Sequence, residues 1–267
     1  MAEISATLVK ELREMTGLGM MECKKALAEA GGDLGKAEEL LRIKSGAKAG
    51  KAAGRIAAEG VVAAWRSADG KLGTLVEVNC ETDFVAKNED FVAFASQVAE
   101  VVATREPGPA EEEQRQKLVQ KIGENITIRR LARLQAKGKL AHYVHNGRIG
   151  VLVDFEGADE VGKDLAMHIS FARPAYLSKS EVPADVVSRE RDILAARAKE
   201  SGKPAEIVAR MVEGGLNKYL GEISLLGQPF IKDDKQTVEK MLAATKGRVL
   251  AYRFLVLSEG LEKKKAA

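Results

Sequence analysis

The sequence predicts an α+β protein, with an N-terminal three-helix bundle followed by a core of two related subdomains, each an antiparallel sheet backed by helices, and an inserted helical hairpin. Three observations predict this fold. Apolar residues follow a helical period over residues 1–45, two Gly-containing turns are flanked by alternating apolar runs, and a helical period returns over residues 183–227. The length of 267 residues, with 45% hydrophobic and 30% charged residues, is typical of a globular chain with more than one module.

Residues 1–45 are expected to form the three-helix bundle. The breaks Thr16-Gly17-Leu18-Gly19 and Gly31-Gly32-Asp33 divide this segment into three short helices. The apolar faces consist of Ile4, Leu8, Val9 and Leu12, then Cys23, Leu27 and Ala30, then Leu34, Ala37, Leu40 and Leu41. Helices this short are not stable alone, so they must pack together.

Residues 46–59 are expected to form a solvated linker helix. The stretch from Lys44 to Arg55 is rich in Ala and Gly and carries four basic residues without an acid. Such a face could follow the phosphates of a nucleic acid, but the aromatic residues that stack on bases are absent from it. An RNA-binding module, whose affinity would fall steeply with salt, stays open as an alternative class of function.

The core begins where the apolar period changes to two. Asp69-Gly70 lies between the apolar runs 61–65 and 74–78. Asn146-Gly147 lies in the middle of residues 140–155. Both dipeptides accept the positive φ angles of tight turns, so each predicts a β-hairpin.

The two hairpins belong to an internal repeat. Residues 69–78 match residues 146–155 position by position in turn, charge and apolar rhythm, at an offset of 77 (146 − 69 = 77). The helical segments that follow, 90–96 and 164–170, also resemble each other. The expected subdomains are therefore residues 60–139 and, interrupted by an insertion, residues 140–182 together with 228–260.

Residues 183–227 are expected to form the inserted helical hairpin, because Gly202 and Pro204 mark a turn between two helical apolar patterns. Its apolar stripe is long for an arm that projects freely into solvent. We expect the stripe to be buried against a second copy, in a homodimer or a 2:2 complex, or against the adjacent subdomain. A strand over 248–257 and a short basic tail, 261–267, complete the chain.

One segment imitates a phosphate-binding loop, because Gly157 to Lys163 has G-x-x-x-x-G-K spacing between a strand and a helix. The next position needs a Ser or Thr hydroxyl to bind Mg²⁺, and here it is Asp164. Asp159 and Glu160 also place negative charge where a phosphate would lie. A nucleotide-dependent enzyme therefore stays only as an alternative class.

No catalytic, cofactor or metal site is expected. His142 and His145 are three residues apart on a predicted strand and point to opposite faces, so they cannot share a metal ion. His168 lies on a predicted helix with no nucleophile near it in sequence. Cys23 and Cys80 form no CxxC pair and are expected to be buried thiols.

Charge and hydropathy argue against two kinds of main partner, nucleic acid and membrane. The 42 basic and 39 acidic residues leave a net charge of +3, too small to indicate nucleic acid as the main ligand. No run approaches the roughly 18 apolar residues of a membrane helix, and the first residues lack the form of a signal peptide. We expect no membrane partner, no direct nucleic-acid partner and a cytoplasmic location.

The most unusual local feature is the segment from Cys80 to Asn88, where a strand gives way to a helix. Thr82 or Asp83 could cap that helix while Phe84 staples it to the core. Alternatively, Phe84 is an aromatic anchor exposed at a protein interface.

The segment from Cys80 to Asn88, together with several others, resembles the bacterial elongation factor Ts family, whose members exchange the nucleotide of elongation factor Tu. The resembling segments are residues 8–27, residues 78–88 (Val-Asn-Cys-Glu-Thr-Asp-Phe-Val-Ala-Lys-Asn), Ala166-Met167-His168-Ile169 and Leu225 to Phe230. They follow one another over essentially the whole chain. The resemblance implies a bundle similar to ubiquitin-associated domains and a partner protein without catalysis.

The resemblance also implies roles for particular residues. Thr82, Asp83, Phe84 and Val85 correspond to the segment that disturbs the Mg²⁺ site of the partner GTPase. Met167 and His168 correspond to a second contact, although Ile169-Ser170-Phe171 follow His168 where small Ala residues are common in the family. Arg13, Met20 and Met21 are implied contacts of the N-terminal bundle.

Overall fold

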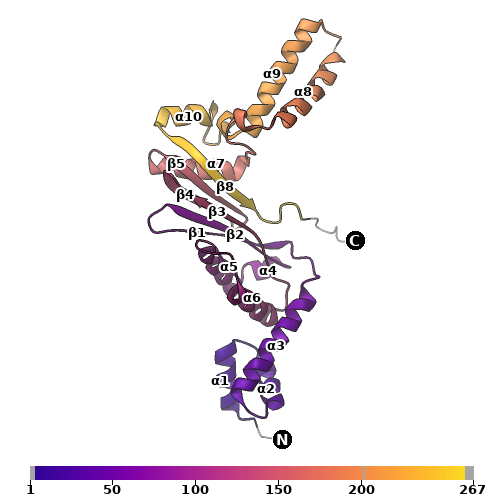
Figure 1. The fold of residues 1–267 in the computed structure, drawn as a ribbon, viewed down its shortest axis with the longest axis vertical. Coiled ribbons are helices and arrows are strands. Elements are labelled where there is room, and N and C mark those ends of the chain that lie inside the picture. Colours follow the sequence, from indigo (N-terminus) through magenta and orange to yellow (C-terminus); the bar gives the residue numbers. More distant parts are fainter. Residues whose placement is uncertain (1–3, 201, 262–267) are drawn as a thin grey trace.

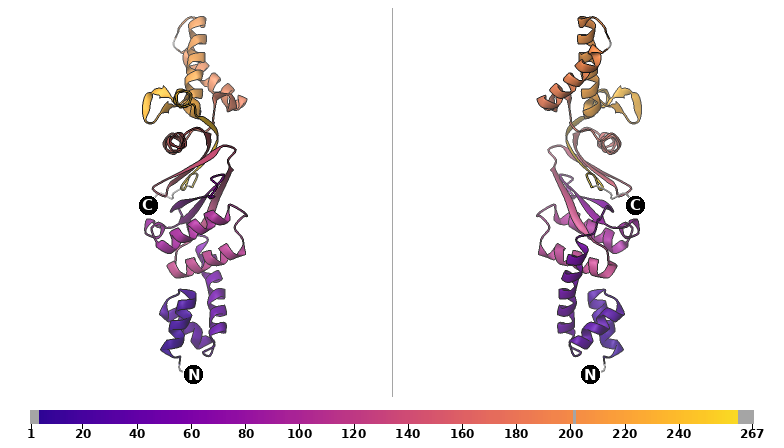
Figure 2. Two further views of the ribbon diagram at one scale, coloured as in Figure 1. Left: turned by 90° about the vertical axis from the view of Figure 1, so that its left-hand side faces the viewer. Right: turned by 90° about the vertical axis from the view of Figure 1, so that its right-hand side faces the viewer.

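The computed structural model describes residues 4–200 and 202–261, and it has the α+β fold class that the sequence predicts. The molecule is elongated (Figure 1), with a helical bundle at one end, two sheets in the middle and a pair of helices at the other end. The two side views in Figure 2 show the same order of parts along the long axis.

Three helices form the N-terminal bundle: α1 (Ala6–Thr16), α2 (Met20–Glu29) and α3 (Leu34–Ala52). The Ser5 side chain caps α1 by accepting from the backbone N–H of Leu8, and Asp33 caps α3 through the N–H of Lys36. Gly17, at φ 68°, ends α1 in the left-handed conformation. The bundle surrounds one apolar core, made of Val9, Leu12, Leu18, Cys23, Ala26, Leu27, Ala37 and Leu41.

The expected linker helix at 46–59 is wrong in two respects. Residues 46–52 are the last turns of the single helix α3, and residues 53–58 are irregular up to the first strand. This end of α3 is not solvated on every side, because Ala49 and Ala52 are buried in the apolar core beside the first sheet. An Ala/Gly-rich helix face allows this close packing.

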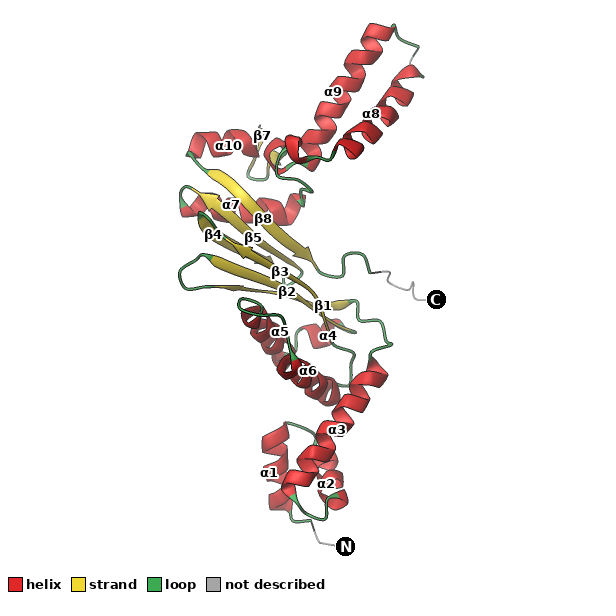
Figure 3. Ribbon diagram, in the orientation of Figure 1, coloured by secondary structure: helices red, strands yellow, loops and turns green. Residues whose placement is uncertain are grey.

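The first sheet contains β1 (Glu59–Arg66), β2 (Leu72–Cys80) and β3 (Thr127–Gln135) in the antiparallel order β1-β2-β3. Helices α4 (Asp83–Ala86), α5 (Glu89–Val101) and α6 (Pro109–Ile122) lie between β2 and β3 in the chain. The pair α5 and α6 covers one face of this sheet (Figure 3). Phe91, Phe94 and Val98 of α5 are buried there against Val76 and Val78 of β2.

The second sheet has the order β4-β5-β8, with β4 (Lys139–His145), β5 (Ile149–Glu156) and β8 (Arg248–Val256) all antiparallel. Helix α7 (Asp159–Ala172) covers its outer face (Figure 3). Smaller elements follow the inserted helices, namely β6 (Pro229–Phe230), β7 (Asp233–Thr237) and α10 (Val238–Thr245).

The two sheets pack face to face through a separate apolar cluster that includes Val62 and Leu75 from one sheet and Leu140 and Leu152 from the other. The contact depends on two glycines at equivalent positions of the repeat. A Cβ on Gly73 would lie 2.5 Å from Leu140, and a Cβ on Gly150 would lie 2.6 Å from Val62.

The inserted segment forms two helices, α8 (Ala184–Lys199) and α9 (Ala205–Ile223). They pair with each other and extend away from the sheets (Figure 1). Ser201, in the expected turn, and residues 262–267 of the expected basic tail lie outside the described residues.

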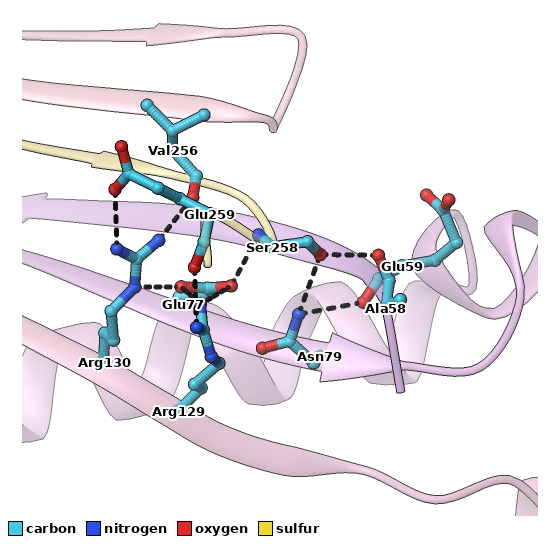
Figure 4. A network of polar contacts seen from close by, with 9 residues as sticks. All are labelled: Ala58, Glu59, Glu77, Asn79, Arg129, Arg130, Val256, Ser258 and Glu259. Atoms are coloured by element: carbon cyan, nitrogen blue, oxygen red, sulfur yellow. Dashed lines mark hydrogen bonds and ion pairs between the residues drawn. The ribbon is translucent and has the colours of Figure 1, made fainter. Parts of the chain in front are cut away.

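A buried carboxylate ties the C-terminal end of β8 to the first sheet (Figure 4). Glu77 of β2 is fully buried and pairs with Arg129 at 3.1 Å and with Arg130. It also accepts the backbone N–H of Ser258 at 2.8 Å. Burial alone would raise the pKa of Glu77, but the Ser258 N–H and the two guanidinium groups outweigh it and lower that pKa.

Candidate functional site around the Thr82 to Val85 turn

The turn after β2 presents its side chains outward. Thr82 precedes α4 and caps it, since its hydroxyl accepts the backbone N–H of Val85 at 3.3 Å. Asn88 caps the next helix, α5, through the N–H groups of Asp90 and Phe91. Two caps only a few residues apart leave α4 as a single helical turn that projects from the end of the sheet.

Phe84, in this turn, is 80% exposed. The alternative in which Phe84 staples the helix to the core is therefore wrong, although the expected cap at Thr82 is present. Val85 is half-buried and packs on the core around α5, so it anchors the turn while Phe84 points to solvent. Phe84 is therefore free to act as an aromatic anchor at a protein interface, the other alternative that the sequence leaves open.

Asp83 is also exposed, and Lys87 lies 3.0 Å from its carboxylate one turn later. The hydrogen bond and charge of Lys87 lower the pKa of Asp83, so this carboxylate is ionised at neutral pH. The turn thus offers a negative charge beside an apolar ring.

Glu124, from the loop between α6 and β3, holds the start of this turn. Its carboxylate accepts the backbone N–H groups of Glu81 and Thr82, each at 3.0 Å, and the Thr82 hydroxyl at 2.6 Å. Sequence reasoning missed Glu124, because no periodicity or motif relates two positions 42 residues apart. The only signal was the Gly123 that ends α6 and forces a loop here.

Arg55, which follows α3, extends this network toward the bundle. Its guanidinium lies 3.1 Å from the Glu81 carboxylate and donates to the carbonyl of Gly123 at 2.8 Å. Asn125 completes the connection, since its backbone N–H donates to Glu81 and its side-chain amide donates to the Arg55 carbonyl at 2.7 Å.

Cys80 lies directly beneath the turn and is buried, as expected, like Cys23. Its thiol donates to the Thr82 carbonyl at 3.2 Å. Burial raises the pKa of Cys80 to about 12, with nearby carboxylates adding to the effect, so the sulfur is a neutral thiol rather than a nucleophile.

The N-terminal bundle exposes a second apolar patch. Met20 and Met21 begin α2 and are 61% and 64% exposed, and Met15 at the end of α1 is 54% exposed. Arg13 is exposed on the same helix as Met15. Flexible thioethers suit an adaptable protein contact.

The two residues predicted as partner contacts on α7 differ in burial. Met167 is half-buried, whereas His168 is 1% exposed. The Nδ1 atom of His168 accepts the N–H of Ile231 at 3.2 Å, so its Nε2 donates to the Gln228 side-chain oxygen at 3.0 Å. Burial lowers the pKa of His168. Phe171, near the end of α7, is 73% exposed and is the apolar group that this helix presents to solvent.

The segment that imitates a phosphate loop holds carboxylates where a phosphate would bind. Asp159 and Glu160 occupy the first turn of α7, and Asp159 pairs with Lys139 at 2.8 Å. Asp164, at the position of the missing hydroxyl, pairs with Lys232. Backbone N–H groups at the start of α7 are therefore screened from an anion by fixed negative charge.

The basic face expected near residues 44–55 is largely neutralised. Within the described residues the ion pairs are Lys44 with Glu29, Lys48 with Glu22, and Arg55 with Glu81. Among residues 4–200 and 202–261, no helix is long and apolar enough to cross a membrane, and no three His, Cys, Asp or Glu residues are grouped as a metal site.

Comparison with known proteins gives a consistent result. The family described as elongation factor TS matches residues 81–259, which include the Thr82 turn, Glu124 and α7. Proteins named elongation factor Ts are similar over nearly the whole chain. One from Nitrosomonas eutropha is 54% identical over 99% of this chain and 95% of its own length. One from Nitrosospira multiformis is 57% identical over 99% and 93%, and one from Burkholderia multivorans 56% over 99% and 94%.

Proposed function

The chain belongs to the elongation factor Ts family of translation elongation factors, and we propose that it is the guanine nucleotide exchange factor of elongation factor Tu. It binds the complex of that GTPase with GDP, perturbs the Mg²⁺ site and promotes GDP release, so that GTP can bind. The observation that carries this proposal is the turn at Thr82 to Val85, which leaves Phe84 80% exposed while Glu124 holds the start of the turn.

Exchange of this kind needs no active-site chemistry in the factor. If the factor and the nucleotide each weaken the binding of the other, the coupling free energy is reciprocal, so fresh nucleotide also displaces the factor. Mg²⁺ bridges nucleotide phosphates to a GTPase, and disturbing its ligands weakens the strongest local electrostatic contact. The protein is accordingly a binding partner without enzymatic activity, cofactor or metal of its own, acting in the cytoplasm.

Three surfaces share the contact in this proposal. Phe84 is the wedge, with Asp83 beside it and with Thr82 and Val85 fixing its direction. Arg13, Met20 and Met21 bind from the bundle. On α7, Met167 reaches the partner from the surface, while the buried His168 supports it by holding α7 to the loop after β6.

We also assign the two sheets to related subdomains, because the glycines that allow their contact, Gly73 and Gly150, occupy equivalent positions of the sequence repeat. In each sheet the first two strands form a hairpin, helices follow in the chain, and a later strand completes the sheet.

The test is the release of a fluorescent GDP analogue from elongation factor Tu, followed by stopped flow with and without this protein. We expect strong acceleration that saturates with the concentration of the factor. Calorimetry on the isolated protein should detect no binding of GDP or GTP. Unchanged release at saturating factor would refute exchange, and nucleotide binding by the factor alone would favour the enzyme alternative.

A further inference from the structure

The turn that carries Phe84 rests on the apolar core through Val85 and Ala86, but it is too short to hold its own shape. Helix α4 is four residues long, and none of its residues is fully buried. A single helical turn is unstable in isolation, because several backbone dihedrals are fixed for one hydrogen bond. Its direction must therefore be set from outside α4.

Glu124 supplies that outside constraint. The N–H groups of Glu81 and Thr82 have no helical acceptor at the start of α4, and both donate to one oxygen of the Glu124 carboxylate. The other oxygen accepts the Thr82 hydroxyl, which leaves the Thr82 oxygen oriented to accept from Val85. With three hydrogen bonds from Glu81 and Thr82, the Glu124 side chain holds the start of the turn in place.

The loop that carries Glu124 is itself braced on both sides. Gly123 accepts from the Arg55 guanidinium, and Asn125 bonds both Glu81 and the Arg55 carbonyl. Arg55 lies just after α3, the helix that leads from the bundle. The position of Glu124 is thus fixed relative to β2 and to the bundle connection.

We propose that Glu124 is the positioning residue of the exchange site: it pre-organises the Thr82 to Val85 turn so that Phe84 already points outward before the partner binds. The inference rests on the proposed function. Because the turn is ordered in the free protein, binding free energy is not consumed in ordering it and is available to displace the partner's Mg²⁺ ligands. Glu124 acts through the turn and need not touch the partner.

The first test compares Glu124→Ala and Glu124→Gln in the full-length protein with saturating factor. We expect E124A to lower the maximal rate of GDP release by about tenfold or more, since small misplacements of a contact group have effects of this size. E124Q should recover most of the rate, because the amide oxygen still accepts both N–H groups. The matched control is E112A, which removes a hydrogen-bonded carboxylate from the exposed side of α6, and it should behave as wild type.

The second test uses the F84A/E124A double variant to separate positioning from general stability. If Glu124 acts through Phe84, adding E124A to F84A should reduce GDP release no further, whereas independent effects would multiply and would overturn the proposal. A wild-type rate for E124A would overturn it as well. If E124A fails to fold, E124D, whose carboxylate is shorter by one methylene, replaces it in the same comparison.

A third measurement on the free protein needs no partner and therefore distinguishes failure of this inference from failure of the proposed function. Amide hydrogen exchange by NMR should show the N–H groups of Glu81, Thr82 and Val85 losing protection in E124A and keeping it in E112A. Unchanged protection would remove Glu124 from the role proposed, whatever the exchange activity of the wild-type protein.

Discussion

At the residue scale, the function proposed for the site depends on one exposed aromatic side chain, Phe84. Phe91, only seven residues after Phe84, is fully buried in the core of the first sheet, whereas Phe84 is 80% exposed. Helix α4 meets the core through Val85 and Ala86 and leaves Phe84 outside it, whereas α5 packs into the core through Phe91. The same residue type therefore has opposite roles within one segment.

We expect Phe84→Ala to reduce exchange strongly and to leave stability nearly unchanged. As an interface anchor, Phe84 should contribute about 2 kcal/mol or more to the complex, which is roughly a 30-fold effect. Its truncation opens no cavity because the ring is exposed. GDP-release rates and thermal melts on the same variant measure the two effects.

The matched control is Phe91→Ala, which removes a fully buried ring and should cost about 3–5 kcal/mol of folding free energy. If F84A melts as early as F91A and exchanges nucleotide normally whenever it is folded, Phe84 has a structural role and is not the interface anchor.

The sequence predicted part of the site and not the rest, for a physical reason. A cap at Thr82 follows from local backbone chemistry, so it could be predicted and is confirmed. Glu124 and Arg55 meet the turn only through the tertiary fold, and nothing local identifies them. The burial of His168 was likewise invisible, since its partner Gln228 lies beyond the inserted helices.

At the element scale, the strands missed by the sequence analysis are those with weak alternation. β3 carries Arg129, Arg130 and Arg133 and is mostly half-buried, so it lacks the apolar period that identified β2 and β5. Its arginines serve the Glu77 cluster and the end of α5 instead. The prediction of a solvated linker at 46–59 fails for the converse reason, because the small side chains of Ala49 and Ala52 pack against the core.

The contact between the sheets predicts that Gly73→Ala and Gly150→Ala are destabilising. Neither glycine has a left-handed φ, so the cost comes from space alone: the added Cβ would lie 2.5 Å from Leu140 in the first case and 2.6 Å from Val62 in the second. Overpacking of this kind costs about 1–3 kcal/mol, which urea denaturation can measure.

The control for this pair is Gly50→Ala in α3, where a Cβ would meet nothing within 4 Å. That substitution should be neutral or stabilising by about 0.5–1 kcal/mol, because Gly weakens a helix. If G73A and G150A were as stable as G50A, the sheets would not be in the close contact described here.

The Glu77 cluster predicts a sensitivity to acid. Because the folded-state pKa of Glu77 lies below its ordinary value of 4.5, its stabilising contribution is complete above pH 4.5 and is lost as pH falls through the lower, folded-state pKa. Glu77→Gln should remove this part of the acid dependence and should destabilise the protein at pH 7 by about 1–3 kcal/mol, because Arg129 and Arg130 lose a buried charged partner while Arg130 keeps its ion pair with Glu259.

Urea denaturation of wild type and E77Q between pH 3 and pH 7 measures both effects. Glu112→Gln, which alters the ion pair between the exposed Glu112 and the mostly buried Arg115 on α6, is the control and should change stability at pH 7 by about 1 kcal/mol or less, because the amide can still accept from Arg115. Parallel stability curves for wild type and E77Q would mean that Glu77 does not carry the acid dependence.

At the scale of the whole molecule, the proposed contacts are spread along an elongated body. The bundle patch and the Phe84 turn are joined by α3 and the Arg55 network, so their relative placement is fixed by a continuous helix and by ion pairs. Such a body can bind its partner at one region and act on it at another. The inserted hairpin lies at the opposite end from the bundle (Figure 1).

That hairpin leads to the last prediction, which concerns self-association. Ile193, Ile207 and Met211 are 40%, 45% and 40% exposed on α8 and α9, and the hairpin extends away from the sheets, so the adjacent subdomain does not cover them in the described structure. We therefore expect a second copy to bury them. Light scattering should detect a dimer of the wild-type protein. The variant that combines Ile207→Lys with Met211→Glu should be monomeric, and the melting temperature of the monomer should not fall, because both side chains are already partly exposed to water.

The control pair, Glu206→Lys with Arg210→Glu, changes charged neighbours on the same helix and should leave the dimer intact. If the wild-type protein is monomeric at all concentrations, we would instead assign the apolar stripe of the hairpin to the contact with the partner. The I207K/M211E variant would then lose affinity for elongation factor Tu.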